Sequence, residues 1–205
     1  LLSVASHPVM LMYLDNAQSI GPSSQVGRRR GAGINENYAR EVLELHTLGV
    51  DGGYSQDDVI GLARMLTGWT IGNDRLARFG AKTGEFAFVE PMHEPGTHRL
   101  LGRDYSMRGR EQGIEALKDL SLHGETARHI ATKLVRHFVA DTPEPRDIEY
   151  VADVYRRTDG HLPSIHKAAM TLASAWNPDN RKLKTPWELL VSMFRGLELP
   201  VSSPG

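Results

Sequence analysis

Apolar side chains between residues 35 and 69 recur at intervals of three and four, the spacing of amphipathic helices. We expect a first helix to begin after Asn35, whose side chain can cap unpaired N–H groups. It should end at Gly49, because glycine readily adopts the left-handed conformation that closes a helix. The face predicted to be buried consists of Tyr38, Ala39, Val42, Leu43 and Leu45.

A second helix is predicted after a short, acidic, glycine-containing loop. Ser55 and Asp58 have the spacing of a capping box, which marks the start of this helix, and Gly68 marks its end. Its apolar stripe consists of Val59, Leu62, Ala63 and Leu66. The two helices therefore predict a helix–loop–helix around which the other segments pack.

The other apolar patterns also favour helices. Residues 1–14 are apolar nearly all round, so this segment is expected to be a buried helix. Residues 15–34 are rich in glycine and serine, carry an arginine run at 28–30, and match no phosphate-binding motif. They predict a solvated, mobile loop. Further helices are predicted at residues 110–121, 125–139, 145–157, 162–176 and 186–197.

Strand-like patterning is confined to a short part of the chain. Glu85–Val89 alternates apolar and polar residues, His98–Leu101 is a second short apolar run, and prolines between them indicate a long turn. We therefore expect a small β-hairpin at about residues 84–105, within one domain that spans residues 1–205. The predicted fold class is mainly α, a single-domain helical bundle with a small β-hairpin insertion.

Composition narrows the classes of function. An apolar content of 40% and a charged content of 24% are ordinary for a soluble protein. The net charge of −1 gives no electrostatic reason to expect nucleic acid as a partner. No apolar run reaches the ~18 residues of a membrane span. The absence of cysteine excludes disulfides and thiolate metal sites and is compatible with either cytoplasm or periplasm. No signal peptide is visible at the start.

One group of candidate site residues lies in the helix–loop–helix. His46 falls in the apolar face of the first helix, with Glu41 on its flank. It is either a core histidine bonded to a carbonyl or a catalytic proton carrier, with Glu41 as a catalytic partner. Asp51, Asp57 and Asp58 are candidate ligands of a calcium ion. Their spacing is shorter than that of an EF-hand loop, and helix capping is the simpler interpretation.

A second group lies on the turn of the predicted hairpin. His93, Glu94 and His98 form the densest cluster of histidine and carboxylate side chains in the chain. Because imidazole and carboxylate are ligands of zinc and other transition metals, Glu94 and His98 are candidate metal ligands. His93 is a candidate catalytic acid or base. The alternative is an exposed loop whose histidines are merely polar.

The chain lacks the motifs of several common enzyme classes. It has no GxSxG elbow, no P-loop and no dinucleotide fingerprint, so no nucleotide or flavin cofactor is expected. What remains is imidazole and carboxylate chemistry, with a divalent cation, calcium or zinc, that polarises a carbonyl or activates bound water. The favoured function is cation-dependent hydrolysis of a small activated acyl compound, an ester or a lactone.

Two other classes of function stay open. The chain can be a non-catalytic binding or assembly module of an exported bacterial complex, docking a partner protein on its first helix or hairpin. It can also be a redox module whose histidines bind haem or iron, although no CxxCH motif exists for covalent haem. Bound metal in the purified protein would separate these classes.

The stretch ENYAREVLELHTLGVDGGYSQDDV, followed by LARMLTGW, resembles the signature of a large bacterial family of proteins of unknown function, numbered eighteen hundred. Later segments keep the order of that family, among them FAF at 86–88, TAR at 126–128 and TDG at 158–160. The resemblance covers nearly the whole chain and implies a mainly helical bacterial protein, often exported. Because family members are longer at the N-terminus, this chain resembles their C-terminal portion. The resemblance brings no established reaction, so no catalytic residue is transferred from it.

Overall fold

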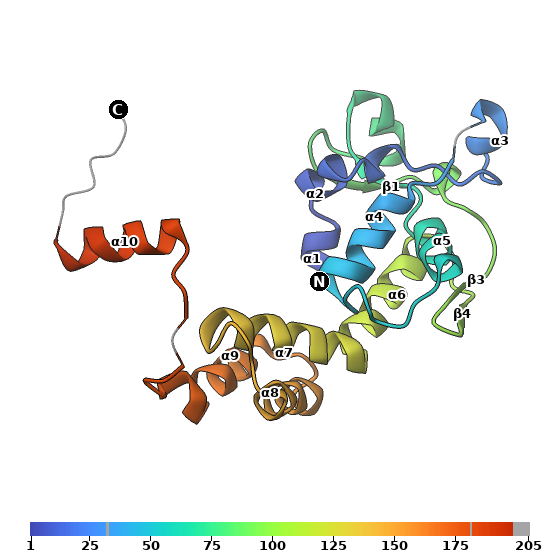
Figure 1. The fold of residues 1–205 in the computed structure, drawn as a ribbon. Helices are drawn as coiled ribbons and strands as arrows, with labels where there is room; N and C mark the ends of the chain where they lie inside the picture. The colour runs from blue at the N-terminus through green and yellow to red at the C-terminus, as the bar shows by residue number, and fades with distance from the viewer. Residues whose placement is uncertain (32, 181, 199–205) are drawn as a thin grey trace.

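The computed structural model describes residues 1–31, 33–180 and 182–198 and is mainly helical (Figure 1), as the sequence predicts. The α-helices are α1 (Leu2–Ala5), α2 (Pro8–Tyr13), α3 (Gly27–Arg30), α4 (Glu36–Glu41), α5 (Gln56–Met65), α6 (Arg110–Leu122), α7 (Gly124–Phe138), α8 (Pro145–Arg157), α9 (Leu162–Met170) and α10 (Pro186–Gly196). The 3₁₀ helices are η1 (Asn16–Gln18), η3 (Asp74–Phe79), η4 (Glu90–Met92) and η5 (Ala173–Trp176), and η2 (Val42–His46) is a π-helix. The strands are β1 (Trp69–Ile71), β2 (Phe86–Phe88), β3 (His98–Leu100) and β4 (Arg103–Tyr105).

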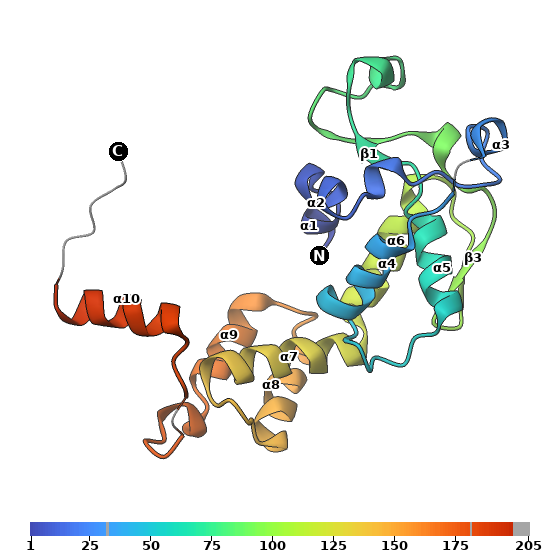
Figure 2. The ribbon, with the colours of Figure 1, turned by 45° about the horizontal axis from the view of Figure 1, so that its top comes forward.

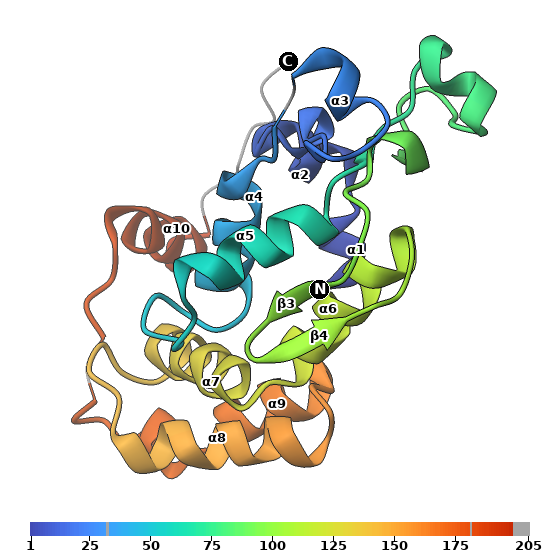
Figure 3. The same ribbon diagram turned by 90° about the vertical axis from the view of Figure 1, so that its right-hand side faces the viewer.

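Buried apolar side chains form two clusters. The first is built from the segments up to α6, with Tyr38 and Trp69 among its fully buried side chains. The second lies among α7, α8 and α9, around Val135, Val151 and Ile165. Figure 3 shows α7, α8 and α9 below α4, α5 and α6, with α6 running directly into α7 at His123. The chain thus has two cores joined by consecutive helices.

The helix–loop–helix begins as predicted but its first helix ends differently. The Asn35 side chain accepts a hydrogen bond from the Asn37 N–H, and Ser55 and Asp58 form a complete capping box. After Glu41, however, α4 continues as the π-helix η2. A π turn contains more residues than an α turn, so it rotates the following side chains. Leu45, expected to be buried, is consequently 50% exposed.

A small β-hairpin is present, but with different partners from those expected. Phe86–Phe88 pairs with Trp69–Ile71, and His98–Leu100 pairs with Arg103–Tyr105, both antiparallel. The predicted pairing of Glu85–Val89 with His98–Leu101 is therefore wrong. Leu101 and Gly102 both have positive φ, which a tight two-residue hairpin turn requires, and they return β4 directly onto β3. The Trp69 side chain is fully buried and anchors β1 in the core, and β2 pairs with β1 there.

The N-terminal and C-terminal segments also depart from the predicted burial. Residues 1–14 form two short helices instead of one, with Pro8 at the start of the second, and Val9, Met12 and Tyr13 are exposed. The helix expected to reach residue 176 ends at Met170 and is followed by η5. In the described chain α10 buries none of its residues, and Figure 2 shows it apart from the other helices. No helix found among the described residues has the length and apolar character that crossing a bilayer requires.

Candidate functional site

A close packing of backbone segments fixes the turn between β2 and β3. The Val89 N–H donates to the Gly68 carbonyl at 2.9 Å, and η4 follows with a proline in its first turn. Gly68 has a φ of +77°, and a Cβ there would lie 2.8 Å from the Val89 carbonyl oxygen. Glycine is therefore needed at residue 68. The turn that carries His93 and Glu94 is held against the end of α5 as a result.

His93 is buried in this turn with one ring nitrogen bonded to the backbone. Its exposed fraction is 7%, and its Nδ1 lies 3.0 Å from the Thr67 carbonyl oxygen. A carbonyl can only accept, so Nδ1 carries the proton and the neutral ring keeps its lone pair on Nε2. No described residue forms a hydrogen bond with Nε2, and the Phe88 ring lies edge-on against the imidazole, with 5.5 Å between the centroids.

Thr67 holds the same turn through its hydroxyl. Its Oγ1 donates to the Arg64 carbonyl at 2.6 Å and accepts from the Glu94 N–H at 2.8 Å. Since the hydroxyl hydrogen is already used, the His93 Nδ1 proton is directed to the Thr67 carbonyl. One residue therefore sets both the path of the turn and the orientation of the imidazole.

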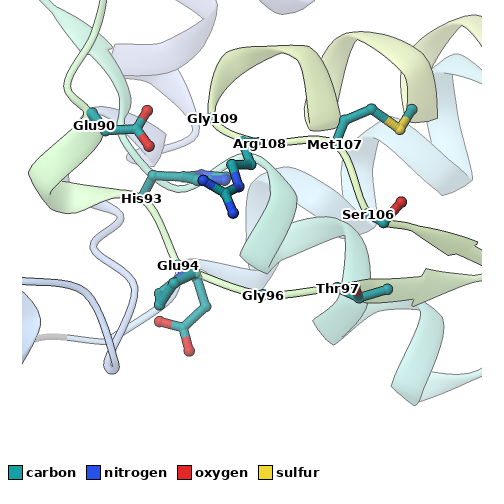
Figure 4. A pocket seen from close by; sticks show the side chains of 10 residues that line it. Glu90, His93, Glu94, Gly96, Thr97, Ser106, Met107, Arg108 and Gly109 are labelled. Carbon is teal, nitrogen blue, oxygen red and sulfur yellow. The ribbon is translucent and has the colours of Figure 1, made fainter.

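His93 forms part of the wall of a cavity of about 480 Å³ (Figure 4). One side of the cavity is the turn from Glu90 to Thr97, and the other is the segment from Ser106 to Gly109 that leads into α6. The side chains drawn in Figure 4 that bear on chemistry are Glu90, His93, Glu94, Thr97, Ser106 and Arg108. Sequence reasoning identified His93 and Glu94 among them and missed the rest.

Gln112 joins the two sides of this cavity. Its side chain is fully buried, and Nε2 donates to the Gly96 carbonyl at 3.0 Å and to the Tyr105 carbonyl at 2.8 Å. Gly109, which precedes α6, has a φ of +61°, and a Cβ there would lie 2.6 Å from Glu90 Oε2. The width of the cavity is thus set by a buried amide and by a residue that must be glycine. Gln112 lies on the predicted helix away from the apolar stripe of Ile114, Leu117 and Leu120, so no sequence pattern marks it.

The predicted metal ligands Glu94 and His98 do not aim at one point. Glu94 Oε2 accepts from the Ser23 N–H at 2.8 Å, and Figure 4 shows its carboxylate turned away from that of Glu90. His98 is buried and its Nε2 lies 3.3 Å from the Glu94 carbonyl oxygen. Burial lowers the pKa of His98, against the opposing effect of that hydrogen bond. Their proposed role as ligands thus gains no support from this geometry.

Among the acidic residues of the helix–loop–helix, Asp58 is held by hydrogen bonds within the protein. Asp58 Oδ2 accepts from the Ser55 N–H and hydroxyl, and Oδ1 accepts from the Leu101 N–H at 2.6 Å. Burial raises the pKa of Asp58, but these hydrogen bonds outweigh it and the pKa is lowered. Asp51 and Asp57 are exposed. Within residues 1–31, 33–180 and 182–198, no three histidine, aspartate or glutamate side chains are grouped to hold a metal ion.

His46 lies in a different cavity from His93. It ends the π-helix η2 and lines a hollow of about 320 Å³ with Val4, Thr126 and Tyr155. Burial and the nearby Lys133 ammonium lower the pKa of His46, while the Glu41 carboxylate opposes them. Glu41 thus acts on the pKa of His46, but no hydrogen bond joins the two among the described residues, and the third predicted catalytic residue, His93, lines another cavity.

Comparison with protein families decides the membership of the chain. The family model described as "Protein of unknown function (DUF1800)" matches residues 1–204. The chain belongs to the DUF1800 family. No curated protein and no solved structure matches the chain significantly. Family membership confirms the resemblance seen in the sequence, and the chemistry of the site rests on its own residues.

Proposed function

We propose that this DUF1800 chain hydrolyses a small activated acyl compound, an ester or a lactone, in the cavity lined by His93. The observation that carries the proposal is the hydrogen bond from His93 Nδ1 to the Thr67 carbonyl, at 3.0 Å. It leaves the Nε2 lone pair free of any described hydrogen-bond partner, on a ring that lines the cavity. An imidazole in this tautomer, held by its other nitrogen, is the usual form of a general base.

In the proposed reaction His93 removes a proton from a water molecule. The water oxygen attacks the acyl carbon, and the proton moves to His93 Nε2. When the tetrahedral intermediate collapses, its bond to the leaving oxygen breaks and His93 returns the proton to that oxygen. The products are a carboxylic acid and an alcohol, or a hydroxy acid from a lactone. His93 ends the cycle as it began, neutral, with the proton on Nδ1 and none on Nε2.

Arg108 is the candidate for stabilising the negative charge that develops on the acyl oxygen. It lines the same cavity from the side opposite the His93 turn and forms no ion pair within the described chain. Glu90 Oε2 already lies beside Gly109, at the start of α6, so the helix end itself is partly occupied by a carboxylate. A guanidinium can donate two hydrogen bonds to an oxyanion, which assigns this role to Arg108.

Dependence on a divalent cation stays a prediction. Glu90 and Glu94 line the cavity of the proposed base and supply its carboxylate groups. A bound cation would polarise the acyl carbonyl. Elemental analysis of the purified protein, and turnover before and after chelation with add-back of calcium or zinc, test this requirement separately from the role of His93.

The test is hydrolysis of a small lactone and of p-nitrophenyl acetate, with His93→Asn compared with His46→Asn. The lactone is included because exposed histidines hydrolyse the activated ester slowly without an active site. Loss of the general base should lower kcat/KM by about 10²- to 10⁴-fold in His93→Asn. His46→Asn should retain wild-type turnover because His46 lies in a separate cavity. Equal activity of both variants, or no turnover by the wild-type protein, would refute the proposal.

A second candidate function is assembly with a second copy of the chain through α10. The observation in its favour is that α10 carries several large apolar side chains, all exposed: Trp187, Leu189, Leu190, Met193 and Phe194. Such a surface is typical of an interface. Sedimentation of the wild-type chain at increasing concentration should show a dimer that Leu190→Glu abolishes. A monomer at every concentration would exclude self-assembly.

A further inference from the structure

A second hollow lies on the other side of the turn that carries His93. Its volume is about 500 Å³, and Arg28, Arg29 and Ser24 line it together with His93, Glu90 and Pro95, which also line the first cavity. We propose that this hollow binds an anionic group of the substrate, so that the compound hydrolysed is an acyl ester carrying a carboxylate or phosphate. This inference rests on the proposed function, because it extends the same site.

The segment that carries the arginines is fixed against the His93 turn. The Gly21 N–H donates to the Met92 carbonyl at 2.9 Å and the Val26 N–H to the Pro91 carbonyl at 3.0 Å. The Ser23 N–H adds the hydrogen bond to Glu94 Oε2 at 2.8 Å. The sequence predicted a mobile loop here, and the described part of that loop instead has three backbone attachments to the turn. The arginines are thereby held next to the proposed base.

The charges at this place favour an anion. Arg28 and Arg29 are exposed and, like Arg108 across the turn, form no ion pair in the described chain. Two acidic residues border this region: Glu90 lines both hollows, and Glu94 lines the first, with its Oε2 bonded to the Ser23 N–H. The two hollows together are lined by three arginines and two glutamates, so the local charge is positive although the whole chain has a net charge of −1.

Guanidinium groups match the geometry of carboxylate and phosphate oxygens. Each can donate two parallel hydrogen bonds, and two neighbouring arginines can hold one anion from both sides. Because His93 belongs to both hollows, an anion bound beside Arg28 and Arg29 would place an attached acyl group next to the His93 imidazole. The anion would thus orient the scissile bond toward the base.

The experiment compares p-nitrophenyl acetate with mono-p-nitrophenyl succinate, which carries an added carboxylate. The variants are the pair Arg28→Gln with Arg29→Gln, and Arg30→Gln as the control. Arg30 belongs to the same short helix but lines neither hollow. The paired substitution should lower kcat/KM for the succinate ester by about 10- to 100-fold and leave the acetate ester unchanged. The control should change neither, and added salt should reduce the preference for the charged ester.

Several outcomes would overturn the inference. An equal fall in kcat/KM on both esters in the paired variant would show a structural effect. If the wild-type protein has no preference for the charged ester, no anion subsite exists. If neither ester is hydrolysed, the proposed function fails, and binding is measured on its own with inorganic phosphate and succinate by calorimetry. Binding that is lost in the paired variant and kept in Arg30→Gln would then support the subsite alone. No binding would refute it.

Discussion

The surroundings of His46 and His93 differ in what holds the imidazole. His46 ends the π-helix η2 in a cavity lined largely by apolar and hydroxyl side chains, and no described residue forms a hydrogen bond with its ring. His93 is bonded at Nδ1 to a carbonyl from Thr67, a residue 26 positions earlier in the chain. Both histidines have carboxylates nearby, Glu41 for the first and Glu90 and Glu94 for the second. The proposal of His93 as general base therefore rests on its fixed tautomer and not on a neighbouring carboxylate, because both histidines have one.

The largest difference in kcat between the two regions should come from replacing the positively charged side chain near each histidine, Arg108 or Lys133. Arg108→Gln should lower kcat on a small lactone by about 10²- to 10³-fold, because a donor to the developing oxyanion is lost. Lys133→Gln should leave kcat unchanged, since Lys133 lies near His46 and its Nζ donates to the Leu45 carbonyl. Steady-state kinetics measure both. A comparable fall in both variants would remove the distinction between the two regions.

The next effect concerns the buried hydrogen bonds that hold each cavity. Gln112→Leu removes both bonds to the Gly96 and Tyr105 carbonyls and should lower the free energy of unfolding by about 1–3 kcal/mol. It should also lower turnover, because the two sides of the His93 cavity are no longer joined. Urea unfolding and lactone turnover are the two measurements.

Tyr155→Phe is the matched change in the other region. It removes the hydrogen bond from the Tyr155 hydroxyl to the Ser121 carbonyl at 2.7 Å, beside the His46 cavity. It should lower the free energy of unfolding by about 1 kcal/mol and leave turnover unchanged. Retention of full activity by Gln112→Leu, or its loss in Tyr155→Phe, would contradict the assignment of the active site.

A smaller effect belongs to the acidic loop, which lies in neither cavity. Asp58→Asn should lower the free energy of unfolding by about 1 kcal/mol at neutral pH, because the cap and the hydrogen bond from Leu101 are weakened. The folded pKa of Asp58 is lowered, so its contribution is present above the unfolded pKa of about 3.9. That contribution is lost as the pH falls through the lower folded pKa.

Thermal melts of Asp58→Asn from neutral to strongly acidic pH measure this contribution. Asp51→Asn serves as the control because Asp51 is exposed and should leave stability unchanged. Added calcium tests the remaining interpretation of this loop. A rise in melting temperature with calcium that both substitutions abolish would favour an ion site over capping.

The smallest effect is on the pH dependence of stability through His46. Burial and the Lys133 ammonium lower the pKa of His46 by more than the Glu41 carboxylate raises it. His46 therefore binds a proton more readily in the unfolded chain than in the folded chain. Stability contributed by the neutral ring is therefore present above the unfolded pKa of about 6.5 and declines below it. His46→Gln should flatten the loss of melting temperature on acidification from pH of about 7 to about 5. An unchanged slope would show that His46 does not titrate in this way.

The local features of the fold could be read from the sequence. The caps at Asn35 and Ser55 depend on neighbouring residues, and both are present in the structure. Strand pairing was not predictable, because β2 pairs with Trp69–Ile71, which lies before an intervening 3₁₀ helix. The π turn of η2 was missed because no residue type marks it.

The candidate site was predictable only in part. The local cluster of His93, Glu94 and His98 drew attention to the turn that lines the cavity of the proposed site. The groups that orient it, Thr67, Gln112 and the segment before α6, come from distant parts of the chain. Spacing along one helix suggested His46 and Glu41, and in the structure Glu41 acts on the pKa of His46 without a hydrogen bond to it among the described residues. The spacing of residues along a helix does not reveal whether a cavity lies beside the histidine or whether a hydrogen bond fixes its tautomer.

The tautomer of His93 is the most direct test of the central claim. Nitrogen-15 NMR of histidine-labelled protein at neutral pH, with the His93 signals assigned through His93→Asn, reports which ring nitrogen carries the proton. The account predicts a protonated Nδ1 and an unprotonated Nε2, because Nδ1 donates to the Thr67 carbonyl. A His93 ring protonated at Nε2 alone would contradict it, since the nitrogen facing the cavity would then have no lone pair for a water proton.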